Sequence, residues 1–216
     1  MEHPKKINIR HLVERISTLT KSGHQDRVTS LLQKLQVQPE SLKSFLYFHP
    51  DHYSRNLIFK NKFVEILVLC WMPGQRSWIH NHHGQHCWMM MAEGTLAVRN
   101  YRRIMCNTQT RRVDLKLTQE YVLTTGGAEM VNPEEPLHMV WNPPELNQQA
   151  ISIHIYSHPF DTCTVFDTNT GTCKDLKLSY TTAFGKTIPA EKFHERPFTP
   201  CTLTAKERCL HCGGGE

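Results

Sequence analysis

The spacing of apolar residues changes near residue 60 and divides the chain into two unlike parts. In the first part apolar residues recur every three to four positions, which is typical of amphipathic helices. The two runs are Ile7, Leu12, Val13, Ile16 and Leu19, and then Val28, Leu31, Leu32 and Leu35. Gly23 separates them, and Pro39 precedes a third short helix over residues 41–48. This pattern predicts an N-terminal helical cap over residues 1–46 that carries no chemistry of its own.

From Phe63 onward the apolar residues form short continuous or alternating runs, which are typical of β-strands. The predicted strands cover residues 63–71, 86–92, 95–101, 111–117, 121–123, 139–141, 150–156, 162–166 and 175–180. Turn residues such as Glu93-Gly94 and Gly126-Gly127 separate them. Many short strands with no helices between them predict an all-β core over residues 47–185, built as a sandwich, jelly roll or barrel.

The size and charge of the chain exclude several classes of protein. Its 216 residues are enough for one domain, or for one domain with a small appendage. The net charge of +5 is spread out, and we interpret the basic segment 102–112 as a solvated hairpin. We therefore expect no nucleic-acid partner and no membrane partner. Since no coiled coil or apolar face is obvious, we expect a monomer.

The cysteines indicate the compartment. The first ten residues lack the apolar core of a secretory signal, and no apolar run is long enough to span a membrane. Eight cysteines in such a chain are expected to be thiols in a reducing compartment and not a disulfide framework. We therefore predict a cytoplasmic protein.

The segment 186–216 differs from the rest because prolines interrupt it and it ends in a Cys-x-x-Cys pair. Cys201, Cys209, His211 and Cys212 have residue types that bind zinc. A single Cys-x-x-Cys pair without a second one is weak support for such a site. We expect a terminal tail with incidental thiols.

Residues 74–94 hold the densest cluster of potential metal ligands in the chain. His80 and His82 form a His-x-His pair, and on a strand both imidazoles of such a pair point to the same face. Imidazoles that point the same way can hold one ion of zinc, copper, iron or nickel. His138, within the segment 127–142, is the candidate for a third ligand. These three histidines are our predicted metal ligands.

Two other histidines and a cysteine lie in the same cluster. His83 breaks the alternation, and His86 is expected to pack or to form a hydrogen bond nearby, so neither is a predicted ligand. Cys87, taken alone, would be a small buried apolar residue. For Cys163 we consider a position near the entrance to the site, which the sequence does not settle.

Two gapped motifs in this region resemble the two motifs of the cupins. The first consists of Gly74, His80, His82, Cys87 and Gly94, and the second of Gly127, Pro133, His138 and Asn142. Cys87 stands where the first motif has a glutamate ligand, and Glu135 replaces a glycine of the second. The resemblance implies a cupin-type small β-barrel, or jelly roll, with a metal ion in its mouth.

Further segments narrow the resemblance to the cysteine dioxygenase family of non-haem iron enzymes, over about residues 45–185. The segment 53–57 resembles the family's tyrosine–arginine segment, and residues 159–163 continue the match. His86-Cys87 resembles its His-Cys pair, and residues 152–156 resemble its Ser-x-His-x-Tyr strand. The resemblance implies one Fe(II) per chain, with L-cysteine and O2 as substrates and cysteine sulfinic acid as product.

The chemistry of these residue types is consistent with that implication. Three neutral histidines leave Fe(II) its full double charge and three open positions, and a thiolate can supply the negative charge that a carboxylate ligand usually brings. This gives a reason for Cys87 where other cupins have glutamate. Zinc has no redox chemistry, so the same ligands with zinc would be hydrolytic or structural.

The remaining candidate site residues follow from side-chain geometry and from the resemblance. Arg55 matches a carboxylate with its planar fork, and Tyr53 would add a hydroxyl donor. Ser152, His154 and Tyr156 alternate along one strand and therefore share a face, where a relay would orient His154 and place the phenol near the metal. By resemblance, Cys87 and Tyr156 become joined by a thioether bond.

Three alternatives remain open. A dioxygenase of 3-mercaptopropionate has, by resemblance, glutamine in place of Arg55 and lacks the cysteine at position 87, so both residues count against it. A non-catalytic or zinc-bound cupin is disfavoured by the complete Ser152, His154 and Tyr156 set. A cupin isomerase is disfavoured because the carboxylate ligand is missing.

Overall fold

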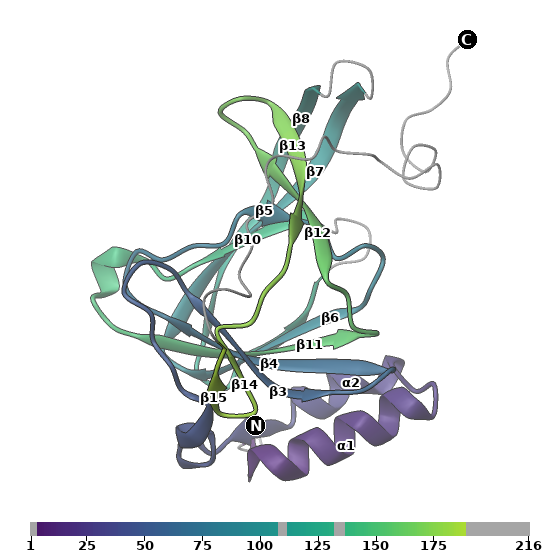
Figure 1. Ribbon diagram of the computed structural model, residues 1–216, viewed down its shortest axis with the longest axis vertical. Helices are drawn as coiled ribbons and strands as arrows, with labels where there is room; N and C mark the ends of the chain where they lie inside the picture. The colour runs from purple at the N-terminus through teal and green to yellow at the C-terminus, as the bar shows by residue number, and fades with distance from the viewer. Residues whose placement is uncertain (1–3, 108–111, 132–136, 189–216) are drawn as a thin grey trace.

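The computed structural model describes residues 4–107, 112–131 and 137–188 (Figure 1). Its N-terminal part consists of β1 (Lys5–Ile7), α1 (Ile9–Lys21), α2 (Asp26–Leu32), β2 (Leu35–Val37) and the 3-10 helix η1 (Pro39–Phe45). The predicted helices are therefore present, but β1 and β2 were not predicted. These two strands pair in parallel and have three residues each, which is too short to leave a recognisable period in the sequence.

The described strands beyond residue 50 form two sheets. One is seven-stranded, in the order β15-β14-β3-β4-β11-β6-β9, and the other closes on itself as β10-β5-β12-β13-β8-β7. The first contains β3 (Ser54–Lys60), β4 (Val64–Trp71), β6 (Cys87–Glu93), β9 (Ala128–Met130), β11 (Ala150–Ser157), β14 (Thr182–Ala183) and β15 (Lys186–Thr187). The second contains β5 (Ile79–His80), β7 (Thr95–Asn107), β8 (Arg112–Thr124), β10 (Leu137–Trp141), β12 (Thr162–Asp167) and β13 (Thr172–Lys177), and the 3-10 helix η2 (Pro144–Leu146) precedes β11.

The central strands β4, β11 and β6 of the seven-stranded sheet are buried on both faces, which explains the continuous apolar run of residues 66–71 in β4. Leu67 and Leu69 point into the barrel, whereas Ile66 and Val68 point to the opposite face. On that face α1 packs on β4 and α2 packs on β6 and β9, and Leu12 lies in the same cluster as Ile66 (Figure 1). The predicted cupin-type barrel with an N-terminal helical cap is confirmed.

The hairpin of β7 and β8 is longer than predicted, because the two predicted strands at 111–117 and 121–123 are one strand. The register shifts between Asn100 and Tyr101, so that Thr118 of β8 is an extra residue. Thr118 donates its hydroxyl to the main-chain oxygen of Asn100 at 3.0 Å. Such a bulge interrupts the alternation of side chains, and the sequence pattern consequently divides one strand into two. β3 was not predicted, and β13 begins at Thr172, three residues before the predicted strand.

Cys70, Cys87, Cys163 and Cys173 are buried free thiols, as predicted. The tail cysteines 201, 209 and 212 lie outside the described residues. Within the described parts of the chain, no helix is long and apolar enough to cross a membrane.

Candidate metal centre

Three of the predicted histidines converge at one end of the barrel. His80 on β5 lies directly opposite His138 on β10, and His82 follows two residues after His80. One ring nitrogen from each of the three lies within 4.8 Å of the others. The ring centroids are 4.7–5.0 Å apart. The sequence therefore identified a set of side chains that the fold brings together.

The residue between the paired histidines explains how both point the same way. The main-chain nitrogen of Asn81 donates to the oxygen of Thr164 at 3.1 Å, and the nitrogen of Thr164 donates to Oδ1 of Asn81 at 2.9 Å. These bonds hold the stretch against β12. Because side chains alternate along an extended chain, fixing Asn81 against β12 turns His80 and His82 to the same side, away from it.

The three imidazoles are neutral, as metal binding requires. Burial lowers the pKa of His80 to about 4. The pKa values of His82 and His138 lie well below the ordinary value, first because both rings are buried and then because of the neighbouring histidines. A cluster of uncharged imidazoles can offer its lone pairs to a cation.

The nitrogen atoms are also suitably disposed for a cation. Nδ1 of His80 lies 2.9 Å from the main-chain oxygen of Trp78, so it carries the hydrogen and Nε2 is left for coordination. Nε2 of His82 is buried and has no hydrogen-bond partner among the described residues. A buried nitrogen of this kind is costly unless something pairs with it. The residues therefore fit a divalent metal ion of the imidazole-binding group.

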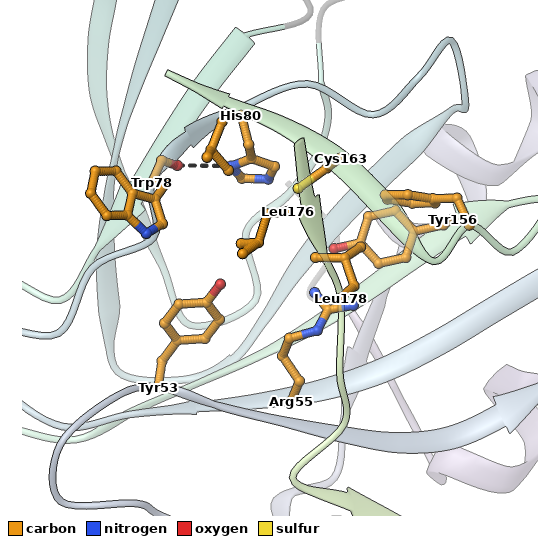
Figure 2. Close-up of a pocket in the computed structure, with 10 residues that line it drawn as sticks. Tyr53, Arg55, Trp78, His80, Tyr156, Cys163, Leu176 and Leu178 are labelled. Atoms are coloured by element: carbon orange, nitrogen blue, oxygen red, sulfur yellow. Dashed lines mark hydrogen bonds between the residues drawn. The ribbon is translucent and has the colours of Figure 1, made fainter. Parts of the chain in front are cut away.

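A narrow cavity of about 30 Å³ adjoins this cluster (Figure 2). The residues that line it include Tyr53, Arg55, Trp78, His80, Tyr156 and Cys163. They come from β3, β5, β11 and β12 and from the loops before β3 and β5. The fold thus brings the predicted carboxylate-binding residues to the same cavity as one predicted ligand.

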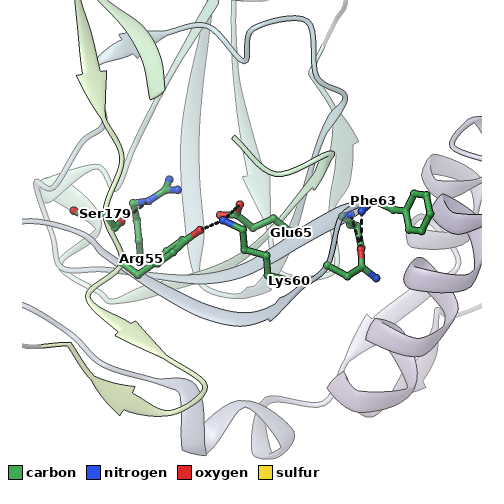
Figure 3. A network of polar contacts seen from close by, with 8 residues as sticks. Arg55, Lys60, Phe63, Glu65 and Ser179 are labelled. Atoms are coloured by element: carbon green, nitrogen blue, oxygen red, sulfur yellow. Dashed lines mark hydrogen bonds and ion pairs between the residues drawn. The ribbon is translucent and has the colours of Figure 1, made fainter. Parts of the chain in front are cut away.

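Arg55 is held at its Nε atom, which donates to the main-chain oxygen of Ser179 at 3.1 Å (Figure 3). Figure 2 shows its guanidinium group extending into the pocket. Burial acts to lower the pKa of Arg55, but Tyr156, Tyr53 and Glu65 outweigh it and raise the pKa above the ordinary value. Arg55 is therefore a fixed cation in the pocket wall.

A buried carboxylate near Arg55 has its own partner. Glu65 is 1% exposed, and its Oε2 atom lies 3.5 Å from Nζ of Lys60, which donates to the hydroxyl of Tyr180 at 2.7 Å (Figure 3). Among the described residues no carboxylate forms an ion pair with Arg55. The guanidinium group is consequently available to an external anion.

The Ser-x-His-x-Tyr strand forms a polar row on the inner face of β11. The hydroxyl of Ser152 lies 2.9 Å from Nε2 of His154, and Nδ1 of His154 lies 3.4 Å from the hydroxyl of Tyr156. The indole of Trp71 donates to the hydroxyl of Ser152 at 2.9 Å. In the arrangement that pairs every group, Ser152 donates to Nε2 and His154 carries its hydrogen on Nδ1, facing Tyr156.

Cys87 and Tyr156 are directly opposed residues of β6 and β11. Both are buried in the same cluster inside the barrel. Burial raises the pKa of the Cys87 thiol, and it raises the pKa of the Tyr156 phenol well above its ordinary value. Both groups are therefore protonated and neutral in this structure.

Sequence reasoning assigned no role at the site to Trp71 or Trp78. Trp71 stacks on Tyr53 with ring centroids 4.4 Å apart and also bonds to Ser152. Trp71 lies two residues after Leu69 and four after Leu67 on β4, and this alternation was the only signal that its side chain faces inward. Trp78 and Cys163 also line the cavity; nothing in the sequence indicated this for Trp78, and the sequence left a position of Cys163 near the site open. His86 stacks on Trp88 at 5.4 Å, as expected of a residue that is not a ligand.

Comparison with known proteins gives a consistent result. The family model "Cysteine dioxygenase type I" matches residues 1–169. Cysteine dioxygenase type 1 of Danio rerio is 28% identical over 190 residues, which are 82% of this chain and 92% of the fish protein. The Homo sapiens enzyme of the same name is 28% identical over 165 residues, 76% of this chain and 80% of its own length.

Solved structures resemble the chain more distantly. The protein TT1209 of Thermus thermophilus has 20% identity and a TM-score of 0.43, covering 54% of this chain and 93% of its own. A cupin-superfamily sugar phosphate isomerase from Silicibacter pomeroyi has 15% identity and a TM-score of 0.41, covering 65% of this chain and 83% of its own.

Proposed function

The chain belongs to the cysteine dioxygenase family, and from this premise we propose that it is an iron-dependent dioxygenase that converts L-cysteine to cysteine sulfinic acid. The observation that carries the proposal is one cavity bordered by both a neutral histidine of the metal cluster and a cation. His80 and Arg55 line the same space, and His82 and His138 adjoin His80. A substrate that carries both a thiol and a carboxylate suits this pairing.

His80, His82 and His138 would hold the metal ion. Iron(II) would supply the redox chemistry that allows triplet dioxygen to react with a closed-shell thiol, which zinc does not offer. Three neutral ligands leave the positive charge of the site uncompensated, so the anionic thiolate form of a substrate is favoured there.

Arg55 and Tyr53 would orient the substrate. Because Nε of Arg55 is engaged by Ser179, the terminal nitrogens of the fork are free to take a carboxylate. The hydroxyl of Tyr53 would add a further donor to the same carboxylate. Trp71 stacks on Tyr53 and keeps its ring against the pocket wall.

Ser152 and His154 would orient the phenol of Tyr156 through the hydrogen-bonded row on β11. The Tyr156 hydroxyl then acts as a donor toward the bound substrate. A thioether bond between Cys87 and Tyr156 is part of the proposal. Its formation removes one hydrogen from the thiol and one from the ring, with O2 taking up the two electrons and two protons, and it fixes the phenol in place.

The test is oxygen uptake by the Fe(II)-loaded protein, with product identification by mass spectrometry. L-cysteine, 3-mercaptopropionate and cysteamine are offered separately under identical conditions. We expect L-cysteine to be converted to its sulfinic acid and the other two to react slowly. Preference for 3-mercaptopropionate would identify that thiol as the substrate in place of L-cysteine. No turnover of any of the three thiols at full iron loading would favour a non-catalytic metal-binding protein.

A further inference from the structure

The mouth of the pocket holds an aromatic side chain that the proposed reaction does not use. Trp78 lines the cavity across from Arg55 and Leu178 (Figure 2). Its side chain is 51% exposed. Of the described residues that line the cavity, Trp78 alone is exposed, and the others are buried or half-buried. The indole therefore stands between the cavity and solvent.

The cavity is too small for the proposed substrate in this structure. Its volume of about 30 Å³ has room for about one or two water molecules. A thiol amino acid has several times the volume of one water molecule, so a wall of the cavity has to move before the substrate can enter.

A second cavity also has Trp78 in its wall. It has a volume of about 190 Å³ and shares two of its lining residues, Trp78 and Val165, with the inner cavity. Val165 is paired to strands on both sides, with Lys174 and with His80. Since Val165 is fixed in the barrel, the indole of Trp78 is the movable one of the two side chains that the cavities share.

The main chain of Trp78 is held firmly although its side chain is not. Its carbonyl oxygen accepts from Nδ1 of His80 at 2.9 Å and from the hydroxyl of Ser77 at 3.0 Å. The side chain is contacted by Nζ of Lys174, 5.6 Å from the ring centroid. A cation over an exposed ring is a weak contact, and exposed side chains change rotamer rapidly. The indole can consequently swing while the carbonyl continues to orient His80.

We propose that the indole of Trp78 is a gate that limits the size of the thiol admitted to the pocket. It swings outward to admit a short thiol amino acid and then rests against that substrate in a more open position than in this structure. Longer thiols and cysteine-containing peptides would keep the indole from packing back over them. This proposal rests on the proposed function, since it concerns the substrates of the same site.

The first test compares Trp78→Ala and Trp78→Phe with the wild type in steady-state turnover of L-cysteine, L-homocysteine and glutathione. Trp141→Ala is the matched control, because its ring also carries a cation, with Cζ of Arg99 at 4.6 Å, but does not line either cavity. We expect the ratio of kcat/KM for homocysteine to that for cysteine to rise about tenfold in Trp78→Ala, in line with the discrimination that one methylene provides. Trp78→Phe should give a smaller rise, and Trp141→Ala none. An unchanged ratio in Trp78→Ala overturns the proposal.

The second test does not depend on turnover. Cys163 lines the inner cavity and is 2% exposed, whereas Cys70 is 0% exposed and packs against the helices. The rate at which a bulky maleimide modifies each cysteine is followed in metal-free protein by peptide mass spectrometry. In Trp78→Ala the rate of maleimide modification of Cys163 should rise about tenfold, as expected when a small steric barrier is removed. The modification rate of Cys70 should not change. Equal Cys163 rates in Trp78→Ala and wild type overturn the gate. Faster Cys163 modification in a protein that oxidises no thiol supports the gate and contradicts the proposed function.

Discussion

Cys87 of β6 and Tyr156 of β11 are directly opposite each other in an antiparallel pair, and both side chains point into the barrel. Their exposed fractions are 1% and 3%. Directly opposed residues have Cβ atoms about 4.5–5.5 Å apart, so a sulfur atom on one lies close to a ring on the other. The strand register therefore connects Cys87 to the polar row that runs through His154 and Ser152.

The first prediction concerns a covalent bond at this pair. Incubation of the Fe(II)-loaded protein with L-cysteine and O2 should produce a form lighter by the mass of two hydrogen atoms. Peptide mass spectrometry should locate the link between Cys87 and Tyr156. Cys87→Ser should abolish the lighter form, and Cys163→Ser should retain it. A lighter form that persists in Cys87→Ser would show that the link is elsewhere.

The second prediction concerns metal loading. His82→Ala and His138→Ala each remove one of three neutral ligands, so both variants should bind little iron after anaerobic dialysis against Fe(II). His86→Ala is the matched control, because His86 belongs to the same histidine-rich stretch but stacks on Trp88. It should bind iron as the wild type does. Normal iron content in His82→Ala would exclude the proposed ligand set.

The third prediction separates carboxylate binding from the chemistry at sulfur. Arg55→Gln should lower kcat/KM for L-cysteine by about two orders of magnitude, because removing one partner of a buried charge pair costs about 3 kcal/mol. Turnover of cysteamine, which has no carboxylate, should be much less affected. Arg99→Gln is the control, since Arg99 bonds to Glu120 outside the pocket. Equal losses for both substrates would show that Arg55 does not act through the carboxylate.

The fourth prediction tests the row on β11. Ser152→Ala leaves the indole of Trp71 and Nε2 of His154 without a partner, which should lower the free energy of unfolding by about 1–3 kcal/mol. It should also lower kcat, since His154 is no longer oriented.

The matched control for that change is Thr29→Val. It also removes a bond from a buried indole to a hydroxyl, from Trp88 to Thr29 at 3.1 Å, on the helical side of the sheet. We expect it to reduce stability, measured by urea unfolding, and to leave kcat unchanged. A normal kcat in Ser152→Ala would show that the hydrogen bonds of Ser152 to His154 and Trp71 contribute to stability and not to catalysis.

The fifth prediction concerns pH. Burial, with smaller contributions from Arg55 and His80, lowers the pKa of His154 from 6.5 to about 3. Between these values the unfolded chain binds a proton that the native protein does not. The stability due to neutral His154 is therefore fully present above pH 6.5 and is lost as the pH falls toward 3.

Metal-free protein should accordingly lose about 1.4 kcal/mol per pH unit for each such group below the unfolded pKa. His154→Gln removes one of these groups and should make the dependence shallower. Urea unfolding at about pH 7 and about pH 5 measures the difference. An equal loss in the variant and the wild type would show that His154 is not kept neutral by the fold.

The sequence by itself determined which side chains share a face. The alternation of Ser152, His154 and Tyr156, and of His80 and His82, follows from the period of an extended chain, so their common orientation could be read locally. The helical cap and the buried β4 were predictable for the same reason. Motif spacing added the third histidine.

Only the tertiary structure decided which faces meet. That Tyr156 is opposite Cys87, that His138 is opposite His80, and that Trp71 bonds to Ser152 depends on strand order and register. The bulge at Thr118 and the position of Trp78 at the pocket mouth are likewise invisible to local periodicity. Periodicity describes one strand at a time, whereas register results from the packing of residues far apart in the chain, and the completed site depends on that packing.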